Sequence, residues 1–419
     1  MCIVKYKIVI DCFLYKTRRT ARMLDLLHAD FIQLMARFDE PYRRYLHGDF
    51  VRAERLSGVL GPRGVGKTTF LLQLIGETPD FLRSTLYVSL DSIHASGIQL
   101  YALADQFRKQ GGRLLVLDEI HHYPDFEREL KSIHDALDLQ VVFSGSSALH
   151  LEHSKADLSR RAVMYAMSGL SFREYLELQT GEPFAVWPLE QVLAEHETLS
   201  LEINRRIRPL AHFGDYLKYG YFPYFRESVE TYHRKLEQTL ALAIDLDIPL
   251  LFKVERDKLA SLKKLLMLLC QSVPNQINIS KLSAAIGSSR STTYAYLHYL
   301  EQANILRSVW GAGRNASMLS KPEKLYLANT NNAWALCPAP PVGTQREIFF
   351  ASQLAQAHAL RYPSEGGDFI VDDRWLFEIG GPGKTSRQIE GHGDAYLALD
   401  DIEHGRGRRV PLWMFGFLY

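Results

Sequence analysis

The residues most able to do chemistry lie in a glycine-rich stretch from Gly61 to Thr69. Its form is G-x-x-x-x-G-K-[ST], and the fixed positions are Gly61, Gly66, Lys67 and Thr68. Such a loop turns its backbone N–H groups inward around a phosphate. Lys67 would reach the β- and γ-phosphates, and the Thr68 hydroxyl would hold Mg²⁺. The stretch predicts a nucleotide site made of Gly61, Pro62, Arg63, Gly64, Val65, Gly66, Lys67, Thr68 and Thr69.

A strand and a helix are expected on either side of this loop. Residues 56–60 (LSGVL) have the pattern of a short apolar strand, and residues 69–75 (TFLLQLI) that of the apolar opening of a helix. A helix N-terminus adds unpaired N–H groups and the positive end of a dipole to a phosphate site. This context favours a phosphate loop over a chance glycine turn.

Two carboxylates follow a second expected strand. Residues 113–117 (RLLVL) contain four consecutive apolar residues, which is typical of a strand buried on both faces. Asp118 would bind Mg²⁺ through water, and Glu119 would orient or deprotonate an attacking water. The alternative is a surface Asp-Glu turn after an ordinary core strand.

His121 and His122 come directly after these carboxylates. As chain neighbours they are expected to point to different faces, and they lack the i, i+4 spacing of a helical metal pair. We therefore interpret them as loop or helix-cap residues rather than metal ligands.

Small hydroxyls and arginines complete the expected site. Residues 140–147 (QVVFSGSS) form another apolar strand, and Ser144 or Ser146 at its tip would sense the γ-phosphate. Further along, Arg161 could stabilise transition-state charge, in cis or towards a neighbouring subunit. The alternatives are a Ser/Gly turn and ordinary surface arginines. Ser171-Phe-Arg-Glu174 has the pattern of a capping box.

Alternating strands and helices with polar strand tips predict an α/β fold, a doubly wound parallel sheet with its ligand at the carboxyl ends of the strands. We divide the chain into a helical lead-in, the nucleotide core, a helical lid, a winged helix and a small α+β tail, with the bounds 1–48, 49–182, 183–258, 259–330 and 331–419. Translation from Met23 instead of Met1 is an alternative that would remove residues 1–22.

The winged helix is predicted from three helices followed by a hairpin. Residues 262–270, 280–287 and 291–304 have helical patterns, and residues 305–310 begin the hairpin. DNA contact and binding of a protein partner both stay open, because Arg290 is the one clear cation near the head of the third helix.

Acidic residues in the tail have the spacing of a restriction-endonuclease-like core. Glu347 lies in a helix, while Asp368 and Glu378 lie in the strands 367–372 and 375–380. Such carboxylates gather a divalent metal around a phosphodiester. The lysine of an E-x-K motif is absent, because position 380 is Gly, but Lys384 could take its place. A metal-dependent nuclease and a metal-free structural remnant are the alternatives.

Composition excludes several other classes of protein. The 419 residues are 47% hydrophobic with a net charge of +1, an ordinary globular profile without a global sign of nucleic-acid or membrane binding. No run of about 18 apolar residues could span a membrane. The cysteines Cys2, Cys12, Cys270 and Cys337 are far apart in the sequence, so we expect neither a disulfide framework nor a zinc site. This usage of cysteine is typical of a protein in a reducing cytoplasm.

Taken together, GPRGVGKTT, LLVLDEIHHYPDFERELK, VVFSGSSALHL, DLSRRA and LSFREYLEL resemble the predicted AAA+ ATPases of prokaryotes. The resemblance covers roughly residues 24–419. It implies an ATP-binding core with a helical lid, a winged helix and a restriction-endonuclease-like C-terminal domain of unknown function. It assigns nucleotide and Mg²⁺ to Lys67, Thr68, Asp118 and Glu119, and the Gly-Arg position to Arg160 and Arg161, with Arg160 where Gly is usual.

These observations predict a Mg²⁺-dependent ATPase or ATP-binding switch. Three outputs compete: a switch acting on protein partners, a DNA-acting ATPase or nuclease that uses the tail, and a module in which ATP is structural. The sequence leaves the oligomeric state open.

Overall fold

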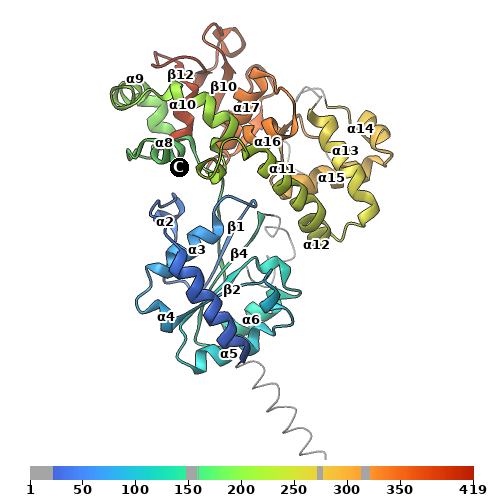
Figure 1. Cartoon of the computed structure of the whole chain (residues 1–419). Helices are drawn as coiled ribbons and strands as arrows, with labels where there is room; N and C mark the ends of the chain where they lie inside the picture. The colour runs from blue at the N-terminus through green and yellow to red at the C-terminus, as the bar shows by residue number, and fades with distance from the viewer. Residues whose placement is uncertain (1–21, 148–157, 159, 271–276, 313–320) are drawn as a thin grey trace, which may run out of the picture. The chain divides into compact units, whose positions relative to one another are not determined.

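The computed structural model describes residues 22–147, 158, 160–270, 277–312 and 321–419 (Figure 1). The alternative start of translation at Met23 concerns residues 1–22, and residues 1–21 lie outside the described residues. Contacts divide the chain into two compact units. The first comprises residues 1–61 and 66–167, and the second comprises residues 62–65 and 168–419.

The first unit contains a five-stranded parallel sheet in the order β2-β3-β4-β1-β5. Its strands are β1 (Leu56–Gly61), β2 (Thr85–Ser89), β3 (Leu114–Asp118), β4 (Gln140–Ser146) and β5 (Val163–Ala166). All residues of β1 and β3 are buried, as continuous apolar runs predict. The predicted α/β parallel sheet is confirmed, and β5, which is half-exposed, is the strand that the sequence pattern did not reveal.

Helices accompany the strands of the first unit. They are residues 22–37, α2 (Leu46–Asp49), α3 (Lys67–Gly76), α4 (Phe81–Ser84), α5 (Leu100–Lys109) and α6 (Phe126–Ala136). In α6, Phe126, Leu130 and Ile133 are buried at the spacing of one helix face. Helix α3 packs against β1 and β4, and α5 packs against α6. The helix predicted from residues 69–75 is confirmed as part of α3.

The second unit begins with helices. They are α8 (Phe172–Thr180), α9 (Leu189–Arg206), α10 (Pro209–Asp215), α11 (Tyr232–Leu242) and α12 (Ile248–Phe252). The predicted capping box opens α8: the Ser171 hydroxyl accepts from the Glu174 backbone N–H, and the Glu174 carboxylate accepts from the Ser171 N–H.

Three further helices precede a hairpin, as the sequence predicted. They are α13 (Leu259–Cys270), α14 (Ile279–Ile286) and α15 (Arg290–Gln302), and the hairpin strands are β6 (Leu306–Gly311) and β7 (Lys324–Leu327). Asn278 and Ser289 accept backbone hydrogen bonds at the starts of α14 and α15. The assignment of this region as a winged helix stays a prediction.

The hairpin also belongs to a seven-stranded mixed sheet in the order β12-β11-β10-β9-β8-β6-β7. The remaining strands are β8 (Leu360–Tyr362), β9 (Phe369–Val371), β10 (Trp375–Gly380), β11 (Ala395–Leu399) and β12 (Arg409–Pro411). Helices α16 (Thr330–Leu336) and α17 (Val342–Leu354) follow β7. Because β6 pairs with β8, one sheet includes strands from both sides of the proposed boundary at residue 330.

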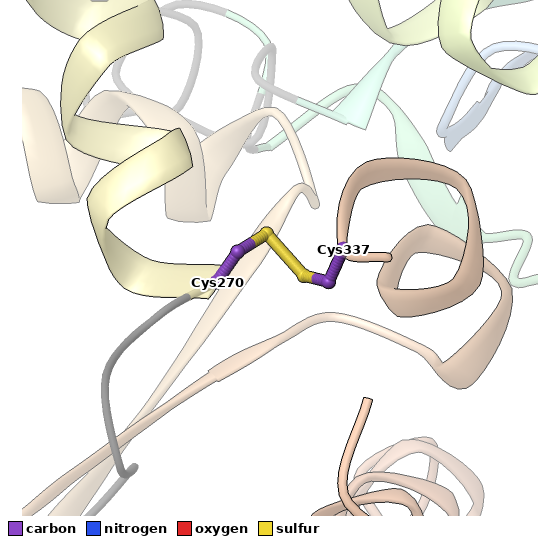
Figure 2. The surroundings of a disulfide bond; sticks show 2 residues. All are labelled: Cys270 and Cys337. Carbon is purple, nitrogen blue, oxygen red and sulfur yellow. A yellow bond between two sulfur atoms is a disulfide. The ribbon is translucent and has the colours of Figure 1, made fainter. Parts of the chain in front are cut away.

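A disulfide joins two helical segments of the second unit (Figure 2). Cys270 is the last residue of α13, and Cys337 is the C-cap of α16. Their Cα atoms lie 5.3 Å apart, although 67 residues separate them in the sequence. We expected no disulfide framework from the sequence and did not foresee this single bond, because only the packing of α13 against α16 brings the two cysteines together.

Candidate functional site

The phosphate loop joins the end of β1 to the start of α3. Gly66 has a φ of 99°, a backbone conformation that favours glycine, and it is the N-cap of α3. The Lys67 ammonium donates to the Gly61 carbonyl oxygen over 2.9 Å, and this lysine is only 5% exposed. The loop therefore places a buried cation beside a helix N-terminus, which suits an anionic ligand.

Thr68 and Asp118 meet although they come from different elements. The Thr68 hydroxyl, at the start of α3, donates to Asp118 Oδ2 over 2.7 Å, at the end of β3. The register of the parallel sheet places the carboxyl ends of β1, β3 and β4 at one edge. A hydroxyl and a carboxylate in contact fit the hard oxygen ligands that Mg²⁺ prefers.

Two more hydroxyls hold the Asp118 carboxylate. Tyr87 on β2 donates to Oδ2 over 2.7 Å, and Ser144 on β4 donates to Oδ1. Burial, followed by the Asp118 charge and hydrogen bond, raises the pKa of Tyr87 well above its usual range, so this phenol stays a donor. Sequence reasoning missed Tyr87. The signal was its position in β2, whose Ser89 pairs in register with Asp118.

Glu119 has an unusual backbone conformation at the end of β3. Its φ is 55° and ψ is 47°, in the left-handed region that a non-glycine residue adopts at a cost of about 1–3 kcal/mol. Its backbone N–H donates to the Ser144 hydroxyl over 3.0 Å. Ser144 thus touches both predicted carboxylate residues, whereas Ser146 is buried in β4 opposite Gly61.

The imidazoles of His121 and His122 do not diverge as expected. Both residues lie in a single 3₁₀ turn, Ile120–His122, and their ring centroids are 4.5 Å apart. His121 is 4% exposed, and its Nδ1 lies 3.3 Å from Glu119 Oε2. The expectation that the two side chains point to different faces was therefore wrong, while their interpretation as loop or helix-cap residues stays a prediction.

Two predicted arginines pair with carboxylates. Arg63 belongs to the second unit by its contacts. Its guanidinium donates to the two carboxylate oxygens of Asp247 over 2.8 and 2.7 Å. Arg161 makes a similar fork with Asp135 on α6, over 2.8 and 2.9 Å, and holds the pKa of that carboxyl at about 2. Asp157 and Ser159 of the DLSRRA stretch around Arg161 lie outside the described residues.

A second cluster lies in the seven-stranded sheet and contains the predicted tail carboxylates. The Lys324 ammonium donates to Glu347 and Asp368 over 3.0 Å each, and its side chain is 4% exposed. Burial alone would lower the pKa of Lys324, but the two carboxylates outweigh it and raise that pKa above its ordinary value. Lys324 had no sequence signal, because it lies 23 and 44 residues from its partners.

Glu378 forms the other half of this cluster. It is 1% exposed and pairs with Lys384, and with the Gln388 amide nitrogen turned towards it, Gln388 donates to both of its oxygens over 2.8 and 2.9 Å. Burial raises the pKa of Glu378, the Lys384 hydrogen bond lowers it, and the neighbouring Asp368 charge raises it further, with a net rise. A Cβ at position 380 would lie 2.8 Å from the Lys384 stem. Lys384 therefore crosses Gly380 and reaches the carboxylate that an E-x-K lysine would serve.

The parallel sheet with a phosphate loop after β1 defines a P-loop nucleotide-binding fold. Residues 53–176 match the family model described as AAA domain, so this part of the chain is an AAA domain. Residues 210–338 match a second model, described as a domain of unknown function (DUF8612).

Among known proteins, an uncharacterized protein of Methanocaldococcus jannaschii is 25% identical over 381 residues, which cover 84% of this chain and 80% of the relative. The Hsp104–ADP complex of S. cerevisiae has 16% identity and a TM-score of 0.27, over 69% of this chain and 39% of that chain. AMPPCP-bound DnaA from Aquifex aeolicus has 16% identity and a TM-score of 0.24, over 59% of this chain and 82% of that chain. These likenesses support no statement about a ligand or substrate of this chain. Among the described residues, no helix has the length and apolar character needed to cross a membrane.

Proposed function

We propose that this AAA+ protein hydrolyses ATP with Mg²⁺ at the edge formed by β1, β3 and β4, and that hydrolysis works as a switch for the rest of the chain. The contact between Thr68 and Asp118 carries the proposal, because it joins two predicted cation ligands from separate elements at 2.7 Å. When bound there, Mg²⁺ would neutralise charge on the phosphate oxygens.

The protein's own groups have distinct roles in this proposal. The backbone N–H groups from Gly61 to Thr69 and the Lys67 ammonium bind the phosphates, and Ser144 positions Asp118 and Glu119. Glu119 orients or deprotonates the attacking water. Arg161 would stabilise transition-state charge only after it leaves Asp135, either in cis or towards a neighbouring subunit.

Turnover by the Glu119→Gln variant tests this assignment. Removing a general base typically costs about 100- to 10,000-fold in rate. We expect ATP hydrolysis to fall at least about 100-fold while ATP binding persists. Glu127→Gln, on α6, is a matched control that should keep the wild-type rate. Equal turnover by wild type and Glu119→Gln would refute the role of Glu119.

A second candidate function uses the tail. The crossing of Gly380 by Lys384 favours it, because a lysine then faces Glu378 although the E-x-K motif is broken. Asp368 and Glu378 would hold the metal of a phosphodiester-cleaving site, in competition with two lysines. DNA cleavage with Mg²⁺ or Mn²⁺ by wild type, lost in Glu378→Gln, would support it. Absence of cleavage would leave the cluster a structural ion-pair network.

Two measurements distinguish a DNA partner from a protein partner. Stimulation of ATP turnover by DNA supports a DNA-acting ATPase, and capture of a protein by Glu119→Gln with ATP supports a protein-directed switch. Recovering neither would argue against the switch.

A further inference from the structure

A cluster of metal-ligating side chains lies beside the proposed water-activating carboxylate. One ligand atom each from Glu119, His121 and His122 lies within 4.8 Å of the others. These residues follow β3 in one tight turn, where the left-handed backbone of Glu119 leads directly into the 3₁₀ turn of the histidines. Two imidazoles and one glutamate are the ligand set of zinc sites that keep a fourth position open.

The spacing within the cluster fits a tetrahedral metal ion. Zinc ligands lie about 2.0–2.2 Å from the metal, so two ligands on one tetrahedral edge are about 3.4 Å apart. His121 Nδ1 and Glu119 Oε2 are separated by 3.3 Å. The ring centroids of His121 and His122 are 4.5 Å apart, and a ligand atom of the half-buried His122 lies within 4.8 Å of a ligand atom of each of the other two residues.

Burial adds an independent indication. Glu119 Oε2 is screened from solvent and accepts no hydrogen bond from the described residues, and the Nδ1 atom of His121 lies 3.3 Å from it. A buried carboxylate oxygen without a hydrogen-bond donor is costly, and a bound cation removes that cost. The Glu119 backbone, in contrast, is already bonded to Ser144.

We propose that Glu119, His121 and His122 form a binding site for a divalent transition metal ion such as Zn²⁺, separate from the Thr68–Asp118 magnesium position. Borderline-soft imidazole ligands favour zinc over magnesium, which prefers oxygen ligands and keeps several waters. A metal ion bound here takes Glu119 as a ligand. Bound Zn²⁺ therefore inhibits ATP turnover by withdrawing the group that activates water, while ATP still binds; this inhibitory part rests on the proposed function.

Binding of Co²⁺ to the nucleotide-free full-length protein tests the site without any reference to hydrolysis. Tetrahedral Co²⁺ with imidazole ligands absorbs visible light, and Zn²⁺ should displace it. Even outer partners of metal ligands change affinity about 10- to 100-fold, so we expect His122→Ala to weaken Co²⁺ binding more than 10-fold. His134→Ala, on α6 outside the cluster, should bind as wild type does.

Several outcomes would overturn the proposal. Absence of a visible Co²⁺ spectrum, or equal Co²⁺ affinity of wild type, His122→Ala and a thermally stable His121→Asn variant, would show that these side chains form only an ion pair and a ring contact. If Co²⁺ binds as expected but Zn²⁺ inhibits wild type and His122→Ala equally in excess Mg²⁺, the inhibitory role is wrong. If the wild-type protein binds Co²⁺ but does not hydrolyse ATP, the proposed function is refuted and the metal site stands.

Discussion

The carboxylates of the two units are held by different kinds of partner. Asp118 in the first unit is held by the hydroxyls of Thr68, Tyr87 and Ser144, and it makes no ion pair within the described residues. The tail carboxylates of the second unit are held by two ammonium groups, those of Lys324 and Lys384. One cluster keeps its negative charge, and the other carries its own counterions.

The difference has a physical consequence for metal binding. Hydroxyl donors orient a carboxylate without cancelling its charge, so a cation gains the full electrostatic attraction. A cation that enters the tail cluster must displace a lysine or share its carboxylates, and it gains less. We therefore expect magnesium dependence in the first unit and stability without metal in the second.

The largest expected effect on stability comes from Lys324→Met. It leaves Glu347 and Asp368 without their shared cation, and breaking a buried ion pair typically costs about 3–5 kcal/mol. Denaturant unfolding of the second unit should report this loss, while ATP binding by the first unit should persist. Unchanged stability would contradict the view that this cluster supplies its own counterion. Lys281→Met, on the exposed part of α14, is the control.

Reduction of the Cys270–Cys337 disulfide should also affect the stability of the two units differently. Closing a loop of this length stabilises a protein by about 4 kcal/mol in the chain-entropy model, and typical values are about 2–4 kcal/mol. We expect a thiol reductant to lower the unfolding temperature of the second unit and to leave that of the first unit unchanged. The Cys337→Ala variant should be insensitive to the reductant.

Tyr87→Phe should have a smaller effect, because it removes one neutral donor from Asp118. Hydrogen bonds to charged groups contribute about 1.5–3 kcal/mol. Asp118 keeps the hydroxyls of Thr68 and Ser144, so the unit should fold, with a modest loss of stability measured by thermal unfolding. A loss of stability as large as that of Lys324→Met would contradict the view that the hydroxyl partners of Asp118 matter less for stability than the lysine partners of the tail carboxylates.

The smallest expected effect is a difference in pH dependence. The Arg161 fork lowers the pKa of the exposed Asp135 to about 2, so its stabilisation is present above the ordinary value of 3.8 and is lost as pH falls towards 2. Burial raises the pKa of Glu378 above 4.5, so its contribution is present at lower pH and declines as pH rises through the raised value. Stability curves of Asp135→Asn and Glu378→Gln should differ from wild type in these opposite directions.

Sequence reasoning succeeded where one local pattern determines one local structure. The stretch from Gly61 to Thr69, the buried strand before Asp118 and the capping box at Ser171 all depend on residues close in the chain. It failed where distant residues meet, as in the Cys270–Cys337 pair and the Lys324 ion pairs. It also failed at His121 and His122, because the left-handed Glu119 and the following 3₁₀ turn replace the geometry assumed for chain neighbours.

The dependence of ATP turnover on Mg²⁺ tests the central claim most directly, measured for wild type and for Asp118→Asn. We predict that wild type is inactive in a chelator and gains activity with Mg²⁺, and that Asp118→Asn needs at least about 10-fold more Mg²⁺, because losing 1.4 kcal/mol of ligand binding already has that effect. Equal Mg²⁺ dependence of the two proteins, or wild-type turnover without Mg²⁺, would contradict the proposal that the Asp118 carboxylate keeps its charge for a cation.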